Sequence, residues 1–375
     1  MSAPPSGTPS GTTAAKNTAS KNMTAKNMTA KNMTATGQLV TRARRRRATR
    51  RRIAVGCLLA GVLVAAALSL MIGRTFYPPG DVLRVIAGET VPGASFTVGR
   101  LRLPRTVLGL VAGLAFGLAG VTFQTMLRNP LASPDIIGIS YGASAAATFG
   151  IVVLSWGGAA VSALAIVAGL GVALLVYLLS YRGGVAGTRL ILVGIGMAAM
   201  LQSATNYFLS KASQWDHHEA MRWITGSLNG ATWEATLPVV AAVAVLAPVL
   251  LGHDRELTQL GLGDDTAAAL GVRVERTRLV AIVAAVGLIA FATAAAGPIA
   301  FVAFLSGPIA ARIVGPNGSP LLPAALVGAL LVLVADLVGQ YATDTRYPVG
   351  VVTGVLGAPY LVYLIVRTHR SGGSL

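Results

Sequence analysis

The sequence predicts an all-α polytopic membrane protein with about ten transmembrane helices. Hydrophobic residues make up 54% of the 375 residues and charged residues only 11%, a combination that a soluble domain of this length would not have. Long apolar runs alternate with short polar connections, and the runs are long enough to cross a bilayer as helices. Alanine, glycine, valine and leucine are abundant, which favours close packing of helices through small residues.

The apolar runs set the predicted spans. The ten spans lie at about 53–72, 105–127, 136–154, 159–181, 189–209, 234–252, 279–297, 299–314, 321–340 and 348–366. We expect them to form one domain over residues 53–370, followed by a short C-terminal tail, 371–375. Gly307 and Pro308 are expected to interrupt the eighth span, because proline removes a backbone donor from a helix.

The N-terminal region has a different composition from the rest of the chain. Residues 1–41 repeat the pentapeptide KNMTA and cannot bury a core, so we expect a disordered tail. Residues 42–52 contain eight arginines directly before the first apolar run. Such a juxtamembrane cluster indicates the cytoplasmic side and a contact with anionic lipid, so the net charge of +17 does not indicate nucleic acid. With an even number of spans, both termini are expected to be cytoplasmic.

One strongly charged segment, 260–278, lies between two long apolar runs. Gly263 and Asp264 are suited to cap a short helix, and Gly271 is suited to end it. A second helical turn is expected to carry Arg273 to Arg278 into the next span. Two interpretations remain open from the residues alone, a solvated loop with scattered charges and a docking surface for a cytoplasmic partner.

The sequence excludes several kinds of chemistry. Cys57 is the only cysteine, so neither an internal disulfide nor a cysteine metal cluster is possible. A Walker A loop needs Gly-Lys-Ser/Thr, and Lys211, the only lysine beyond the tail, follows Leu209 and Ser210. Any ATP must therefore be hydrolysed by another chain. His217 and His218 are adjacent, so their side chains diverge on a helix, and we expect a surface helix there and no metal site.

Few polar groups lie at membrane depth. Asp336 is the main ionisable one, and we expect it to pair with a neighbouring polar group, although an ion-coupled secondary transporter remains a distant alternative. Gln202 and Asn206 fall on one stripe of the fifth span and are expected either to line a pathway or to form interhelical hydrogen bonds. Met197 is expected either to line the same pathway or to fill the core.

Arginines also lie on the predicted outer side, against the usual charge bias. Five of them surround the first outer loop and the start of the second span: Arg74, Arg84, Arg100, Arg102 and Arg105. An acidic partner that docks on this face would explain them.

Several sequence motifs together resemble those of the FecCD/BtuC family of ABC-importer permeases, over residues 101–366. The matching motifs are LRLPRT at 101–106, RNPLASPDIIGISYGA at 128–143, MRWITGSLNG at 221–230, LGVRVERTR at 270–278, GPIAFVAFLSGPIAAR at 297–312 and YPVGVVTGVLGAPYLVYL at 347–364. The resemblance implies a BtuC-like permease fold, in which two ten-helix subunits form a dimer around a central pathway.

The resemblance also assigns roles to residues. It implies that the segment 263–278 forms coupling helices that contact an ATPase through Gly263, Asp264, Asp265, Ala268, Leu270, Gly271, Arg273, Glu275, Arg276 and Arg278. It implies that Arg102 and Arg105 dock a substrate-binding protein. The third docking position reads Gln340, so Arg346 is expected to replace it. The fifth and tenth spans would lie nearest the dimer axis, and the implied pathway residues are Met197, Gln202, Asn206 and Thr353.

The function implied is that of a permease subunit in the bacterial cytoplasmic membrane, importing iron–siderophore complexes of the ferric enterobactin type. Its expected partners are a second, different permease subunit, two ATPases that carry ATP and Mg, and a substrate-binding lipoprotein. The chain itself would hold no cofactor, because the Fe(III)–siderophore is its cargo. An importer of haem or vitamin B12 is the alternative within the family.

Overall fold

The computed structural model describes residues 45–181, 187–315, 318–342 and 344–370. The tails predicted at 1–41 and 371–375, and the first arginines of the basic cluster, lie outside these ranges. The chain divides into two units, 1–53 and 54–375. The described part of the first unit is the arginine-rich beginning of helix Arg45–Met71.

The described ranges are helical and contain no β-strand, as the sequence predicted. Within these ranges, seven helices are long and apolar enough to cross a membrane, and three shorter apolar helices bring the set to the ten expected. The long ones are Arg45–Met71, the helix Ala94–Met126 that contains α4 (Leu103–Met126), α6 (Gly158–Ser180), α7 (Gly187–Lys211), α9 (Trp233–Gly252), α12 (Val274–Ala296) and α14 (Leu321–Tyr341). The shorter ones are α5 (Ile139–Val152), α13 (Val302–Val314) and the apolar part of α15 (Val349–Arg370).

Shorter elements connect these helices. They are α2 (Pro79–Ile86), α3 (Ala94–Phe96), the π-helical turn Thr97–Arg102, the 3₁₀ turn Pro134–Ile137, α8 (Gln214–Thr225), α10 (Asp254–Leu260) and α11 (Asp264–Ala269). Helix α12 begins at Val274, five residues before the expected start of the seventh span, and carries the charged residues 275–278 in its first turns, as the expected second helical turn required.

The predicted interruption of the eighth span was also wrong. Helix α13 continues through Pro308 as one element. Proline at this position cannot donate to the carbonyl of Phe304, four residues earlier. The side chain of Gln124 on α4 supplies that donor, with its Nε2 at 2.9 Å from the Phe304 oxygen. A long-range hydrogen bond therefore replaces the missing backbone bond and keeps the helix whole.

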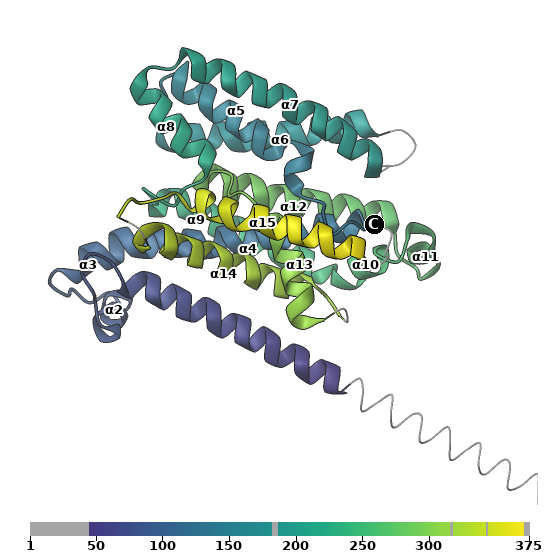
Figure 1. Ribbon diagram of the computed structural model, residues 1–375, viewed down its shortest axis with the longest axis horizontal. Helices are drawn as coiled ribbons and strands as arrows, with labels where there is room; N and C mark the ends of the chain where they lie inside the picture. Colours follow the sequence, from purple (N-terminus) through teal and green to yellow (C-terminus); the bar gives the residue numbers. More distant parts are fainter. Residues whose placement is uncertain (1–44, 182–186, 316–317, 343, 371–375) are drawn as a thin grey trace, which may run out of the picture. The chain divides into compact units, whose positions relative to one another are not determined.

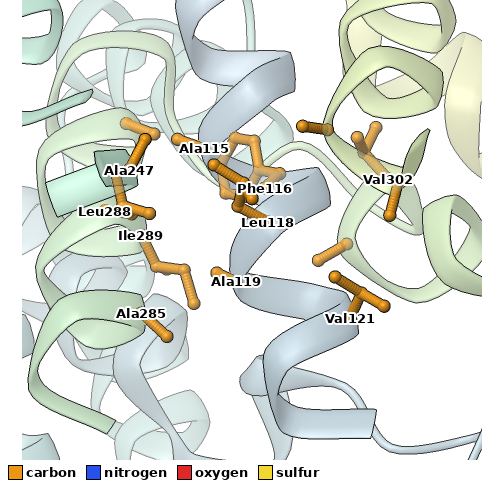
Figure 2. Packing of buried hydrophobic residues seen from close by; sticks show 14 of the residues in the cluster. Ala115, Phe116, Leu118, Ala119, Val121, Ala247, Ala285, Leu288, Ile289 and Val302 are labelled. Carbon is orange, nitrogen blue, oxygen red and sulfur yellow. The ribbon is translucent and has the colours of Figure 1, made fainter. Parts of the chain in front are cut away.

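Helix α4 lies at the centre of the second unit. It packs against α14, α12, α13 and α9, and most of its residues are buried. Figure 2 shows Phe116 and Leu118 of α4 between Ala247 of α9 and Leu288 of α12 on one side and Val302 of α13 on the other. Because α4 is covered on these sides by other helices, its sequence shows only weak segregation of apolar residues to one face.

Glycines set the closest approach between helices. An added Cβ on Gly113 of α4 would lie 2.5 Å from the Cα of Ala329, and one on Gly328 of α14 would lie 3.0 Å from the Cα of Gly117. The two backbones therefore touch along a stripe where no side chain fits.

A second group of helices, α5 to α8, packs together and appears in teal at the top of Figure 1. Helix α5 packs against α6, α7 and α8, and α12 contacts both α5 and α6. Helix α12 thus joins this group to the helices around α4.

We predict that Gly117→Val destabilises the protein by about 1–3 kcal/mol, because its side chain would collide with the backbone of α14 at Ala324 and Ala325. Thermal unfolding of the purified protein in detergent measures this change. Gly171→Val on α6 is the matched control, since an added Cβ there meets no atom within 4 Å. Equal melting temperatures for the two variants would contradict the prediction.

Candidate functional site

The charged segment forms a compact surface from α10, α11 and the start of α12. Gly263 precedes α11 with φ 113° and Gly271 follows it with φ 90°, conformations that favour glycine. The predicted short helix and its glycine stop are confirmed. The expected capping role of Asp264 was wrong, because Asp264 is the first residue of α11 and its side chain makes no cap.

Asp264 instead holds an ion-pair cluster together. Its carboxylate accepts a hydrogen bond from Arg278 at 2.9 Å and lies 3.7 Å from Arg128, which follows α4. Glu275 pairs with the same Arg278 at 3.6 Å. The guanidinium of Arg278 is largely buried, so removal of Asp264 would leave much of its charge unpaired.

A second contact fixes α10 to α12. Thr277 donates to Glu256 at 2.6 Å, and Leu257, Leu260, Ala267 and Val272 are buried beneath the segment. The contacts of Glu256 and Arg128 with this surface were not predicted from the sequence. Arg128 stands out in the proline-rich turn RNPLASP, but no nearby residue indicates that it would contact Asp264.

Nine of the ten predicted coupling residues fall into two sets, and the tenth, Gly263, is partly buried before α11. Asp264 and Arg278 point into the cluster and stiffen it. The exposed set is Asp265, Ala268, Leu270, Gly271, Arg273, Glu275 and Arg276. Leu270 is 56% exposed among these charges, and Leu262 between α10 and α11 is 64% exposed, so the surface presents large apolar side chains as well as charges.

At the opposite end of α4, Arg105 is engaged within the chain. It forms a two-pronged pair with Asp336 of α14 at 2.6 and 2.8 Å, and it donates to Asn229 at 2.6 Å. Gln340 donates to the same Asn229 oxygen at 3.2 Å. The predicted polar partner of Asp336 is confirmed and is Arg105.

The guanidinium of Arg102 is also occupied. It donates to the carbonyls of Leu70, Met71 and Thr75, and it lies 5.0 Å from the ring centre of Tyr77. The N–H groups of Arg102 that were expected to bind a partner protein therefore already donate to carbonyls of this chain. Arg346 is exposed.

Arg84 on α2 pairs with Glu89 at 2.7 Å. The hydrogen bond that Arg84 donates to this carboxylate, together with the charge of Glu89, raises the pKa of Arg84. Arg84, one of the arginines predicted on the outer side, therefore has an acidic partner within this chain.

A cavity of about 600 Å³ opens among α5, α7, α15 and the segment before α13. Its wall carries polar groups on a mostly apolar lining, among them Ser140, Ser144, Gln202, Thr205 and Asp135. The Asp135 carboxylate accepts hydrogen bonds from Ser140 at 2.5 Å and Ser133 at 3.1 Å. The wall therefore offers weak hydrogen-bonding groups and few charges, which suits passage better than tight binding.

Of the predicted pathway residues, Gln202 lines this cavity and donates to Asn206 at 3.2 Å. Met197 does not line it, because Met197 packs against the hydrophobic core. Thr353 does not line it either, since it is buried and donates to the carbonyl of Gly350 in its own helix. Phe301 was missed. It lies on the wall with φ 63°, a strained backbone for a residue with a Cβ.

The WDHHEA stretch forms α8, the surface helix that was expected. The rings of His217 and His218 are 6.5 Å apart and nearly perpendicular, so they do not converge on one point. Ser213 caps the helix by accepting from the Asp216 amide.

Ten apolar helices in the described ranges, with a mostly apolar cavity among some of them, define a polytopic helical membrane protein. The chain belongs to the FecCD transport family, whose model matches residues 61–367. It is similar to the ferric enterobactin permease FepG of Escherichia coli, with 40% identity over 311 residues, 82% of this chain and 93% of the relative. The achromobactin permease CbrC of Dickeya dadantii is 37% identical over 306 residues, 80% of this chain and 88% of the relative.

A solved structure gives the same class. An inward-facing metal-chelate type ABC transporter superposes with a TM-score of 0.75 at 26% identity, covering 84% of this chain and 98% of that one. The predicted BtuC-like permease fold is therefore confirmed.

We predict that Asp336→Asn destabilises the protein by about 3 kcal/mol, because Arg105 loses the partner that offsets its burial. The double variant R105M/D336L should regain most of that loss, since it removes both charges together. Thermal unfolding in detergent compares the three proteins. A double variant no more stable than Asp336→Asn would argue against a pair of this kind.

Proposed function

We propose that this chain is a permease subunit of an ATP-driven importer of ferric siderophore complexes. The similarity to permeases of ferric enterobactin and achromobactin transport systems supports the cargo. In this proposal two ATPases carry ATP and Mg, a second and different permease completes the pathway, and a lipoprotein delivers the complex. The assembly lies in the bacterial cytoplasmic membrane with both termini of this chain inside.

The observation that carries the ATPase partnership is the stiff charged surface of α10, α11 and α12. A partner's movement can only tilt a helix if the contact between them does not yield. The bonds from Asp264 to Arg278 and from Glu256 to Thr277 tie the exposed turn directly to α12. Force applied near Leu270 would therefore reach a helix that contacts α4, α9, α5 and α6.

The cavity supports the passage of cargo. A ferric siderophore is large and mostly presents oxygen atoms, so the hydroxyl and amide groups near Gln202 can contact it through single, weak hydrogen bonds. Strong binding at this point would slow release. A second permease subunit would close the cavity from the side of α7 and α15.

We predict that Leu270→Asp lowers ATP hydrolysis stimulated by the loaded binding protein about tenfold or more, because an anchoring interface residue contributes about 2 kcal/mol. The assay uses the complete transporter in liposomes. Leu270→Met, which keeps an apolar side chain of similar volume at the same exposed position, is the matched control. Full stimulation in Leu270→Asp would refute the coupling role.

Docking of the binding protein is proposed to use Arg102, Arg105 and Arg346. Of these three, Arg346 is exposed, and Arg102 and Arg105 are held in place by their own contacts. Arg346→Glu should weaken capture of the binding protein, and added salt should reduce the difference from the wild type. Arg346→Lys keeps the charge and serves as control. Binding that is insensitive to both charge reversal and salt would remove Arg346 from the interface.

Uptake of radiolabelled iron tests the cargo. Proteoliposomes with the complete transporter should accumulate iron supplied as a ferric catecholate siderophore only when ATP is inside. Unlabelled vitamin B12 should not compete. Accumulation driven by an ion gradient without ATP would overturn the proposed class.

A further inference from the structure

A second hollow lies apart from the cavity just described. It has a volume of about 460 Å³, within the range of about 300–1000 Å³ typical of small-molecule sites. Its walls come from α6, α8, α9 and α12 and from the turn between α8 and α9. None of its lining residues is shared with the cavity that holds Gln202.

The hollow has a charged end. Glu219 and Arg222 of α8 and Glu234 of α9 line it together with the hydroxyl groups of Ser227 and Thr232. Within the part of the chain that the structure describes, none of these three charged side chains forms an ion pair. All three are exposed, and the guanidinium of Arg222 lies against the turn at Gly230. The charged end thus offers one guanidinium and two carboxylates to a ligand.

The other end of the hollow is apolar. Val161, Ile166, Val239 and Phe291 belong to its lining. The helices α6 and α9 that flank it are the kind that face lipid, because their spanning windows are only 28% and 22% buried. Large apolar residues stand exposed along both, including Val167 at 69% and Val245 at 64%. A ligand here would meet the charged group of side chains and the hydrocarbon of the membrane at once.

We propose that this hollow binds one phospholipid with a primary amine in its head group. The phosphate pairs with Arg222, whose guanidinium suits phosphate oxygens. The ammonium donates to Glu219 and Glu234, and an acyl chain lies along the apolar wall between α6 and α9. Two carboxylates against one guanidinium disfavour an anionic head group, and a quaternary ammonium has no hydrogen to donate. The site is independent of the cargo and of the ATPase contact.

Native mass spectrometry of the intact transporter tests the proposal, with phosphatidylethanolamine, phosphatidylglycerol and phosphatidylcholine supplied in equal amounts. The wild type should retain phosphatidylethanolamine preferentially. The double variant E219Q/E234Q should lower that preference about two- to fivefold for each charge removed. His217→Gln, on the same helix but outside the hollow, should leave it unchanged.

A second pair of variants tests the apolar end. Ala163→Trp on α6 places a bulky group at a lining position and should reduce the amount of bound phospholipid of every head group. Ala160→Trp, three residues away on the same exposed stretch but outside the lining, should not. Glycerophosphoethanolamine, which has the head group without acyl chains, should not displace the lipid. Displacement by it, or retention that is equal for all head groups and all variants, would overturn the proposal.

Discussion

The close approach of α4 and α14 is the constraint on which the rest of the structure depends. Without a hydrophobic driving force inside a bilayer, helices associate through backbone contact, and the glycines at Gly113 and Gly328 permit it. That contact sets the register of α4. One end of α4 then presents Arg105 to Asp336, and the other end brings Arg128 to Asp264. A single helix thus positions groups at both ends of the molecule.

The packing divides most of the helices into two groups. Helices α4, α14, α12 and α13 share many contacts, and a hydrogen bond joins α4 to α13. Helices α5 to α8 form the other group, and α15 contacts the first group mainly through α14. The cavity that holds Gln202 lies where the two groups and α15 meet, so its width depends on how they sit against one another.

The sequence allowed the helix count, the segment boundaries to within several residues and the glycine stop at Gly271 to be predicted. These features depend on local composition, because the length of an apolar run and the conformation of glycine act within a few residues. Predictions from local sequence failed where the structure depends on contacts between residues far apart in the chain. The continuity of α13 depends on Gln124, and the position of Asp264 in an ion pair depends on Arg278. The contacts of Arg102 with the carbonyls of Leu70, Met71 and Thr75 also could not be predicted from nearby sequence. Gln202 lines the cavity among α5, α7 and α15, whereas Thr353 is buried by the packing of α15, and the pathway role of both stays a prediction.

The bond between Gln124 and the Phe304 carbonyl has an evolutionary consequence. A backbone oxygen left without a donor in hydrocarbon costs several kcal/mol, so proline at position 308 is tolerable only while an amide stands opposite it. Replacing that proline with an ordinary residue would restore the regular helix bond and free position 124 for an apolar side chain. Across the family, these two positions should therefore change in concert, although they lie in different spans and far apart in the chain.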